Sequence, residues 1–518
     1  MAEQLNIDQC EITIIGTGLV ESIIAGAFQR IDKLTLHLDA NDYYGGEWSS
    51  HTLDGLEKWA EAQKESKTTE SAAPANINGR KFVPLQYVSP YTNVEKQWHV
   101  PEDLEPGSDG RKIFKWTKRT LLDENKKFNI ELSPKVLLSS GDMVELLISS
   151  GVSRYLEFKN VLKIMTFVEE EDRIVSVPCS RADVFSTDEV TVVEKRLFMK
   201  LMESCQNEKT IEAENKEFAD KTFLEYLKYK KLTPRLIHYA TSAITQTNET
   251  TPFKEGVERV QKFIKSLGRF GNSPYLWTQY GTGEIPQAFC RLCAVFGGVY
   301  YLNRDVDGLL VSNDNICTGI VTNGKAVDCN YCVLANGYIP GSSQPSRTRG
   351  ISRAIFITDR SLNENNEEKV VVMTISGSEF RIFETGYETA SAPKDIRIVH
   401  FFGGQITSAK EDIESLAKRF LNLNEEDDDE KPRVLWSLYF NTCQVEFDGK
   451  YPENVFHIEG PGADLDIDGV VSKAKEVYAK AYGDIEFLPK APEPEDIILD
   501  DGDATSADKA EEEKKSTA

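Results

Sequence analysis

The feature that most constrains the fold is a glycine-rich turn directly after a short apolar strand. Residues 10–15 read Cys-Glu-Ile-Thr-Ile-Ile, and the turn Gly16-Thr17-Gly18 follows them. From residue 19 to 29 apolar side chains recur at helical spacing, and from Leu34 to Leu38 they alternate with polar ones up to Asp39. Strand, helix and strand in this order predict the βαβ unit that opens a doubly wound α/β fold.

A turn of this kind holds a dinucleotide pyrophosphate when it reads Gly-x-Gly-x-x-Gly. Here Gly16 and Gly18 are present, but Glu21 stands at the third position. A carboxylate at about 4 Å repels a phosphate by roughly 1 kcal/mol in water and about 4 kcal/mol at an effective dielectric of 20. Two interpretations remain. The turn is a purely structural connection between strand and helix, or it binds a dinucleotide, as in an FAD-dependent oxidoreductase. Glu21 favours the first interpretation, so we expect no cofactor.

Composition excludes several classes of function. The 518 residues are enough for more than one domain, and no run of 18 apolar residues predicts a membrane-spanning helix. Met1 to Gln9 has no apolar core, so we expect no secretory signal. The net charge of −24 argues against nucleic-acid binding and is compatible with a basic protein partner.

The nine cysteines are scattered, and two pairs, Cys290 with Cys293 and Cys329 with Cys332, have a Cys-x-x-Cys spacing. No histidine lies near either pair in the sequence. A metal or redox role is therefore less favoured than buried, reduced thiols, and we expect no metal site.

Residues 186 to 267 change to a helical period. Ser186 and Glu189 form a capping-box pattern, and Val190, Val193, Leu197 and Leu201 then share one face. Further helix starts follow at Thr222 and at Thr233-Pro234, and a fourth helix over Val257 to Leu267 is stopped by Gly268.

Strand patterns return over residues 299–334, with turns at 313–315 and 323–324, and again over 350–460. We expect a discontinuous α/β domain of residues 1–177 and 268–492, with a doubly wound part and an additional sheet. An all-helical domain of residues 178–267 is inserted into it. The acidic stretch 424–431 is expected to be a solvated loop, and residues 493–518 a disordered acidic tail.

Several longer motifs carry a resemblance to a known family. They are residues 15–21, including Glu21, then 42–47, 153–159, 268–275 and 280–287 with Arg291. Together they resemble the Rab escort protein and Rab GDP-dissociation-inhibitor family. That resemblance implies a flavoprotein-like fold without flavin chemistry.

Within the family, residues 178–185, 193–196 and 494–500 are similar to the escort type. The resemblance implies that Phe185 and Arg196 contact the Rab geranylgeranyltransferase. The sequence alone leaves open that Phe185 is a hydrophobic staple on Val190, and that Arg196 lies on a solvated face.

The resemblance also implies that Tyr44, Glu284, Arg291 and Tyr301 belong to a Rab-binding platform. Alternatives remain for three of these residues. Tyr44 could cap the turn at Gly45-Gly46, and Glu284 and Arg291 could form a structural ion pair.

By the same resemblance the chain has no catalytic residues of its own. It would bind newly made, GDP-bound Rab GTPases, present them to the α/β heterodimer of the transferase, and shield the geranylgeranyl group of the product. Such a protein is cytoplasmic and contacts membranes transiently. A Rab GDP-dissociation inhibitor is the alternative within the family, and an FAD-dependent oxidoreductase is the alternative from another class.

Overall fold

The computed structural model describes residues 5–63, 76–77, 79–103, 115–160, 163–362, 370–423 and 430–490. Most of the acidic stretch 424–431 lies outside these residues, as do the whole tail 493–518 and the motif 494–500.

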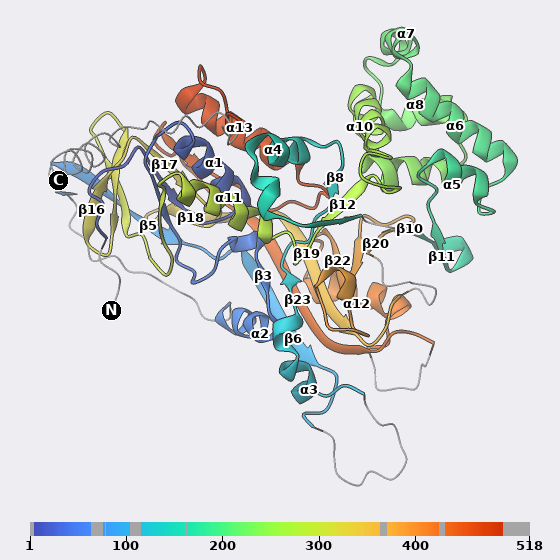
Figure 1. Cartoon of the computed structure of the whole chain (residues 1–518), viewed down its shortest axis with the longest axis horizontal. Helices are drawn as coiled ribbons and strands as arrows, with labels where there is room; N and C mark the ends of the chain where they lie inside the picture. Colours follow the sequence, from blue (N-terminus) through green and yellow to red (C-terminus); the bar gives the residue numbers. More distant parts are fainter. Residues whose placement is uncertain are drawn as a thin grey trace, which may run out of the picture.

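A five-stranded parallel sheet contains the glycine turn, at the left of Figure 1. Its order is β13-β2-β1-β17-β24, formed by Val299–Tyr301, Thr35–Leu38, Ile12–Ile15, Tyr331–Leu334 and Val455–His457. The helix α1, Leu19–Gln29, connects β1 to β2 and packs on α11, Glu284–Val295, and α13, Asp468–Tyr482. The predicted βαβ unit is therefore confirmed, with its strands one or two residues shorter than the sequence pattern suggested.

An eight-stranded sheet crosses the centre of the molecule (Figure 1) and confirms the second sheet that the sequence predicts. Its order is β11-β10-β20-β21-β22-β19-β23-β6, formed by Arg173–Ser176, Lys163–Val168, Val371–Ile375, Arg381–Thr385, Arg397–Gly404, Pro345–Thr358, Val434–Phe447 and Tyr91–Trp98. Only β10 and β20 pair in parallel. The helix α12, Ala409–Phe420, covers β19 and β23.

A third, antiparallel sheet contains the predicted meander. Its order is β16-β15-β14-β5-β18, formed by Lys325–Asp328, Cys317–Thr322, Gly308–Val311, Arg80–Tyr87 and Tyr338–Pro340, and β4, Asn76–Ile77, pairs with β5. Two small sheets connect the larger ones: β8 (Leu137–Leu138), β12 (Tyr275–Thr278) and β9 (Phe158–Asn160), and β3 (Ser50–His51) with β7 (Ile130–Glu131). The remaining helical segments of this part are η1 Gly46–Trp48, α2 Leu53–Ala62, α3 Lys118–Asp123, η2 Asn125–Lys127, α4 Asp142–Ser150, η3 Val152–Tyr155, η4 Glu169–Glu171 and η6 Tyr387–Thr389.

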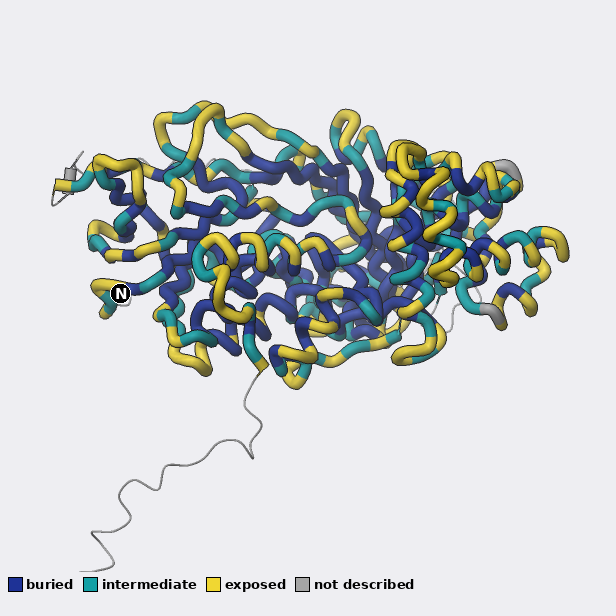
Figure 2. Tube along the Cα trace, turned by 90° about the horizontal axis from the view of Figure 1, so that it is seen from above, coloured by how far each residue is buried: buried dark blue, intermediate teal, exposed yellow. Residues whose placement is uncertain are grey.

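Consecutive helices fill residues 181–266 and gather at one end of the molecule, at the upper right of Figure 1. They are α5 Arg181–Ser186, α6 Val192–Gln206, α7 Glu208–Phe218, α8 Phe223–Tyr229, α9 Pro234–His238, the π-helix η5 Tyr239–Thr245 and α10 Phe253–Ser266. Their buried aromatic side chains share a core with strands of the central sheet. Figure 2 shows buried residues through the middle of the molecule and exposed ones on its outer loops and helix faces.

The predicted helix starts hold at two positions and fail at one. Thr222 and Glu225 cap α8 reciprocally, and Thr233 caps α9 with Pro234 at its first position. The cap at Ser186 is wrong, because Ser186 ends α5 and donates to the carbonyl of Asp183. Thr191 and Glu194 form the capping box of α6 instead, as the backbone N–H of Thr191 donates to the Glu194 carboxylate at 2.9 Å.

The later start leaves Val190 outside α6, so the apolar face counted from Val190 is not the buried face of this helix. Val193, expected on the apolar face, is 64% exposed. The buried residues of the helix are Phe198, Leu201, Ser204 and Cys205.

All nine cysteines are free, and eight of them, including Cys290 and Cys293, are buried, as the sequence predicted for these two. No helix among the described residues has the length and hydropathy that crossing a membrane requires.

Candidate functional site

The glycine turn is held in a conformation that only small residues permit. Gly16 has a φ of +98°, and a Cβ built on it would lie 2.4 Å from the Cβ of Ala335. The helix α1 begins at Leu19 directly after Gly18, so its free N–H groups face the turn. The backbone here thus has the shape of a dinucleotide-binding turn.

Glu21 fills the space above that turn. Its side chain is buried, and an Oε atom lies 2.5 Å from where a Cβ of Gly18 would stand. Burial above all, together with the nearby Glu47 and Asp39 carboxylates, raises the pKa of Glu21 to about 8. At neutral pH the group is therefore mainly protonated, so its volume rather than charge repulsion is the main obstacle to a phosphate.

Asp39, at the end of β2, is the position at which a dinucleotide fold binds ribose. One of its carboxylate oxygens accepts hydrogen bonds from the backbone N–H and the hydroxyl of Thr17, at 2.8 and 2.6 Å. The other accepts two from Asn41, at 2.8 and 2.9 Å. The chain thus satisfies this carboxylate by itself. With Glu21 over the turn, these residues do not fit a bound FAD.

Glu21→Gln is expected to remove part of the pH dependence of stability. The folded-state pKa of about 8 lies above the ordinary value of 4.5, so folding retains a proton that the unfolded chain releases. Stability from this group is fully present below about pH 4.5 and is lost as pH rises toward 8. Between pH 5 and pH 9 we expect the variant to gain about 2–4 kcal/mol relative to wild type. Urea unfolding at both pH values measures this.

The control for this experiment is Glu212→Gln on an exposed position of α7, which should leave the pH profile unchanged. Some slope should remain in Glu21→Gln, because burial also raises the pKa of Glu47 and of Glu131 to about 7. An unchanged wild-type profile in Glu21→Gln would show that Glu21 is not a buried, proton-holding group.

The helix α11 carries two of the predicted platform residues on one face. Glu284 lies half-buried in its first turn, and Arg291 is exposed two turns later. Among the described residues no ion pair joins them: Glu284 accepts from Gln287 Nε2 at 3.3 Å, and the Arg291 guanidinium lies 4.5 Å from the centre of the Tyr155 ring. Partial burial raises the pKa of Glu284. The alternative of a structural ion pair is therefore wrong.

Tyr44 lies beside this helix, in the segment that follows β2. The backbone N–H of the next residue, Gly45, donates to the Thr17 hydroxyl at 3.0 Å, which ties the segment to the glycine turn. The Tyr44 ring is half-buried, its pKa is raised by burial, and it meets the Tyr300 ring edge-on at 6.2 Å between centroids.

Tyr301 is directed away from this group. Successive side chains of a strand point to opposite faces, so Tyr300 and Tyr301 of β13 diverge. The Tyr301 hydroxyl accepts from the backbone N–H of Asn6 at 3.3 Å, and Arg304 stacks on its ring at 5.3 Å. The structure thus places Tyr300, which sequence reasoning missed, next to Tyr44. The alternation within β13 is the signal that identifies it.

Phe185 and Arg196 lie at the start of the helical region. Phe185 is 63% exposed on α5, whereas Val190 is buried, so the hydrophobic-staple alternative is wrong. Lys195 Nζ donates to the Phe185 carbonyl at 3.1 Å, which places α5 against the first turn of α6. Val192 and Val193, each 64% exposed, lie in the same first turn of α6. Arg196 is exposed one turn after Val192.

Phe185, Val192, Val193 and Arg196 are named here the α5–α6 surface. The two valines were missed from the sequence because periodicity assigned Val193 to the core. The capping pattern Thr191-x-x-Glu194 is the signal that could have corrected this.

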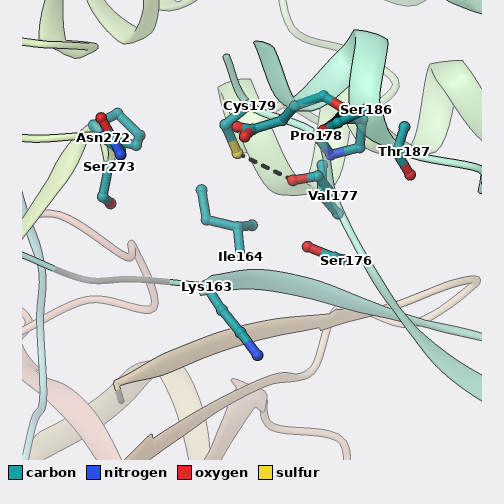
Figure 3. Close-up of a pocket in the computed structure, with 12 residues that line it drawn as sticks. Lys163, Ile164, Ser176, Val177, Pro178, Cys179, Ser186, Thr187, Asn272 and Ser273 are labelled. Atoms are coloured by element: carbon teal, nitrogen blue, oxygen red, sulfur yellow. Dashed lines mark hydrogen bonds between the residues drawn. The ribbon is translucent and has the colours of Figure 1, made fainter. Parts of the chain in front are cut away.

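A cavity of about 280 Å³ lies beneath α5. Figure 3 shows the residues that line it. Strands β10 and β11, residues 177–179 and the loop 272–274 form its other walls. Cys179 Sγ donates to the Val177 carbonyl at 3.3 Å on one side. Apolar, hydroxyl and charged side chains line it together, so α5 meets the sheet over an incompletely packed contact.

Comparisons with known proteins agree with the fold and with the sequence motifs. The model of the family "GDP dissociation inhibitor" matches residues 6–78 and 112–381, and that of "RAE1/2 domain I, C-terminal region" matches residues 351–463. The Rab proteins geranylgeranyltransferase component A of Drosophila melanogaster is 33% identical, over 96% of this chain and 93% of that protein. Component A 1 of Homo sapiens is 31% identical, over 97% and 95%.

A solved Rab GDI from Plasmodium falciparum superposes with a TM-score of 0.68 at 19% identity, over 94% of this chain and 100% of that one. At this identity the likeness establishes the α/β fold. The two family models and the full-length relatives establish more: the chain belongs to the GDP dissociation inhibitor family and, within it, to the Rab escort proteins, component A of Rab geranylgeranyltransferase.

Proposed function

We propose that the chain is a non-catalytic escort that brings Rab GTPases and their geranylgeranyltransferase together. It binds a newly made, GDP-bound Rab at Tyr44, Glu284 and Arg291, and docks the transferase heterodimer at the α5–α6 surface. Holding both partners raises the local concentration of the Rab cysteines at the transferase, typically to the millimolar range for short flexible connections.

The observation that carries this proposal is the presence of two separate exposed surfaces. One lies on α11 beside the parallel sheet, and the other on α5 and α6 at the far end of the molecule (Figure 1). Each combines aromatic or apolar side chains with an arginine, the residue types that protein interfaces favour. This arrangement supports a template that contacts two partners simultaneously.

Each of the two proposed domains has its own binding function. Residues 1–177 and 268–492 form the Rab-binding part, in which Tyr301 has a supporting place on the opposite side of β13 from Tyr300. Residues 178–267 form the part that docks the transferase and, after the reaction, shields the geranylgeranyl group while the product is carried to a membrane. The aromatic-rich core of these helices supplies the apolar surroundings that an isoprenoid needs.

Reconstituted prenylation tests the proposal. A Rab, the transferase and geranylgeranyl diphosphate are combined with and without this protein, and lipid incorporation into the Rab is measured. We expect efficient incorporation only with the protein. Equal incorporation without it would contradict the escort function, and extraction of already prenylated Rab from membranes as its only activity would identify a dissociation inhibitor.

A further inference from the structure

Tyr280 combines an unfavourable backbone conformation with an exposed aromatic ring. Its φ is +66°, in the left-handed region that bulky residues rarely adopt. The residue is nevertheless 46% exposed, so packing of its ring explains little of why the conformation is kept. Backbone strain of this kind concentrates at binding and catalytic sites.

Hydrogen bonds on both sides hold Tyr280 in place. Its own N–H donates to the Thr389 carbonyl at 3.1 Å, and the N–H of Gln279 donates to the Glu157 carbonyl at 2.9 Å. Two residues later, the N–H of Thr282 donates to the buried Glu131 carboxylate at 2.6 Å. The turn is therefore rigid, and the ring projects from a fixed point.

That point adjoins the residues proposed to bind the GTPase. Tyr280 precedes Glu284 by four residues. Between them, Gly283 packs against Ser50, because a Cβ on Gly283 would lie 2.8 Å from the backbone nitrogen of Ser50. Ser50 belongs to the segment that also contains Tyr44. Thr389, which accepts from Tyr280, ends the short helix η6, whose Tyr387 is 52% exposed. Two exposed tyrosines thus stand on hydrogen-bonded turns beside the start of α11.

We propose that Tyr280, with Tyr387 beside it, is an aromatic anchor that contacts the bound Rab GTPase. The proposal rests on the proposed function and adds a specific contact to it. Tyrosine is enriched among interface residues whose truncation is most costly. A ring that projects from an already fixed backbone costs less conformational entropy on binding than one on a mobile loop, and so contributes more affinity.

Tyr280→Gly is the test, because glycine adopts a positive φ without strain. The variant removes the ring and should not lower the melting temperature. We expect its affinity for a GDP-bound Rab to fall at least about 10-fold, and that of Tyr280→Phe to stay within about 3-fold of wild type. Tyr229→Ala, an exposed aromatic on α8 with no role in either proposed surface, is the matched control and should bind Rab normally.

The outcomes separate this inference from the proposed function. If Tyr280→Gly binds Rab like wild type while Arg291→Ala is weakened, Tyr280 is not a contact and the escort function stands. If wild type itself does not bind Rab, the proposed function fails. If Tyr280→Gly unfolds, the variants Tyr280→Asn and Tyr387→Ala test the anchor instead. Weaker Rab binding at an unchanged melting temperature supports the anchor, and normal Rab binding overturns it.

Discussion

Phe185→Ala is expected to lower the affinity for the geranylgeranyltransferase by at least about 30-fold, which corresponds to about 2 kcal/mol. The ring is 63% exposed, and Val192 and Val193 at the start of the neighbouring α6 are each 64% exposed, so docking would remove apolar side chains from water. The melting temperature should remain near wild type, because truncating an exposed side chain usually changes stability by less than about 0.5 kcal/mol.

Three measurements on this variant distinguish the possible roles of Phe185: melting temperature, affinity for unprenylated Rab and affinity for the transferase. Only the third should change, and Rab prenylation should fall when the protein is limiting. Tyr229→Ala is the matched control, since Tyr229 is 55% exposed on α8 of the same helical region. Normal transferase binding by Phe185→Ala would remove the α5–α6 surface from the proposal and favour the inhibitor alternative.

The parts of the fold that the sequence predicts are those with local signals. The opening βαβ unit, the meander and the strands around residues 354–358 and 397–402 have apolar patterns that depend on one short segment. In contrast, β6 was not predicted, because of its eight residues only Tyr91 is buried. Its pairing with β23 joins residues more than 300 positions apart, such as Trp98 and Trp436, and no local pattern encodes such a pairing.

For the candidate sites too, local sequence patterns did not predict which side chains contact each other or are exposed. Glu284 and Arg291 were identified by resemblance, and only the structure excludes an ion pair between them. Periodicity placed Val193 in the core because Val190 was counted on the same helical face, whereas α6 begins only after Thr191 and leaves Val190 outside the helix. The strain at Tyr280 was invisible in the sequence, since tyrosine is not a residue that predicts a positive φ.

The second large effect is expected for Arg291→Ala, which should weaken binding of a GDP-bound Rab by about 2–4 kcal/mol, roughly 30- to 1000-fold. Arg291 is exposed, and the contact that the structure gives its guanidinium is the Tyr155 ring. A charged group already oriented by a ring is presented to a partner at a low entropic cost. Isothermal titration of each variant with Rab measures the effect, and circular dichroism checks the fold.

Arg291→Lys makes the test more specific. Lysine keeps the positive charge but lacks the planar guanidinium that stacks on an aromatic ring and donates to a carboxylate in pairs. Affinity close to wild type in Arg291→Lys would indicate that charge alone acts, whereas a loss approaching that of Arg291→Ala would indicate oriented, paired hydrogen bonds. Arg196→Ala, an exposed arginine on the α5–α6 surface, is the matched control and should leave Rab affinity unchanged.

Because Glu284 lies on the same face of α11 without an ion pair to Arg291, Glu284→Ala should weaken Rab binding independently. Unchanged Rab affinity in both single variants, with normal circular dichroism, would place the Rab-binding surface elsewhere on the molecule.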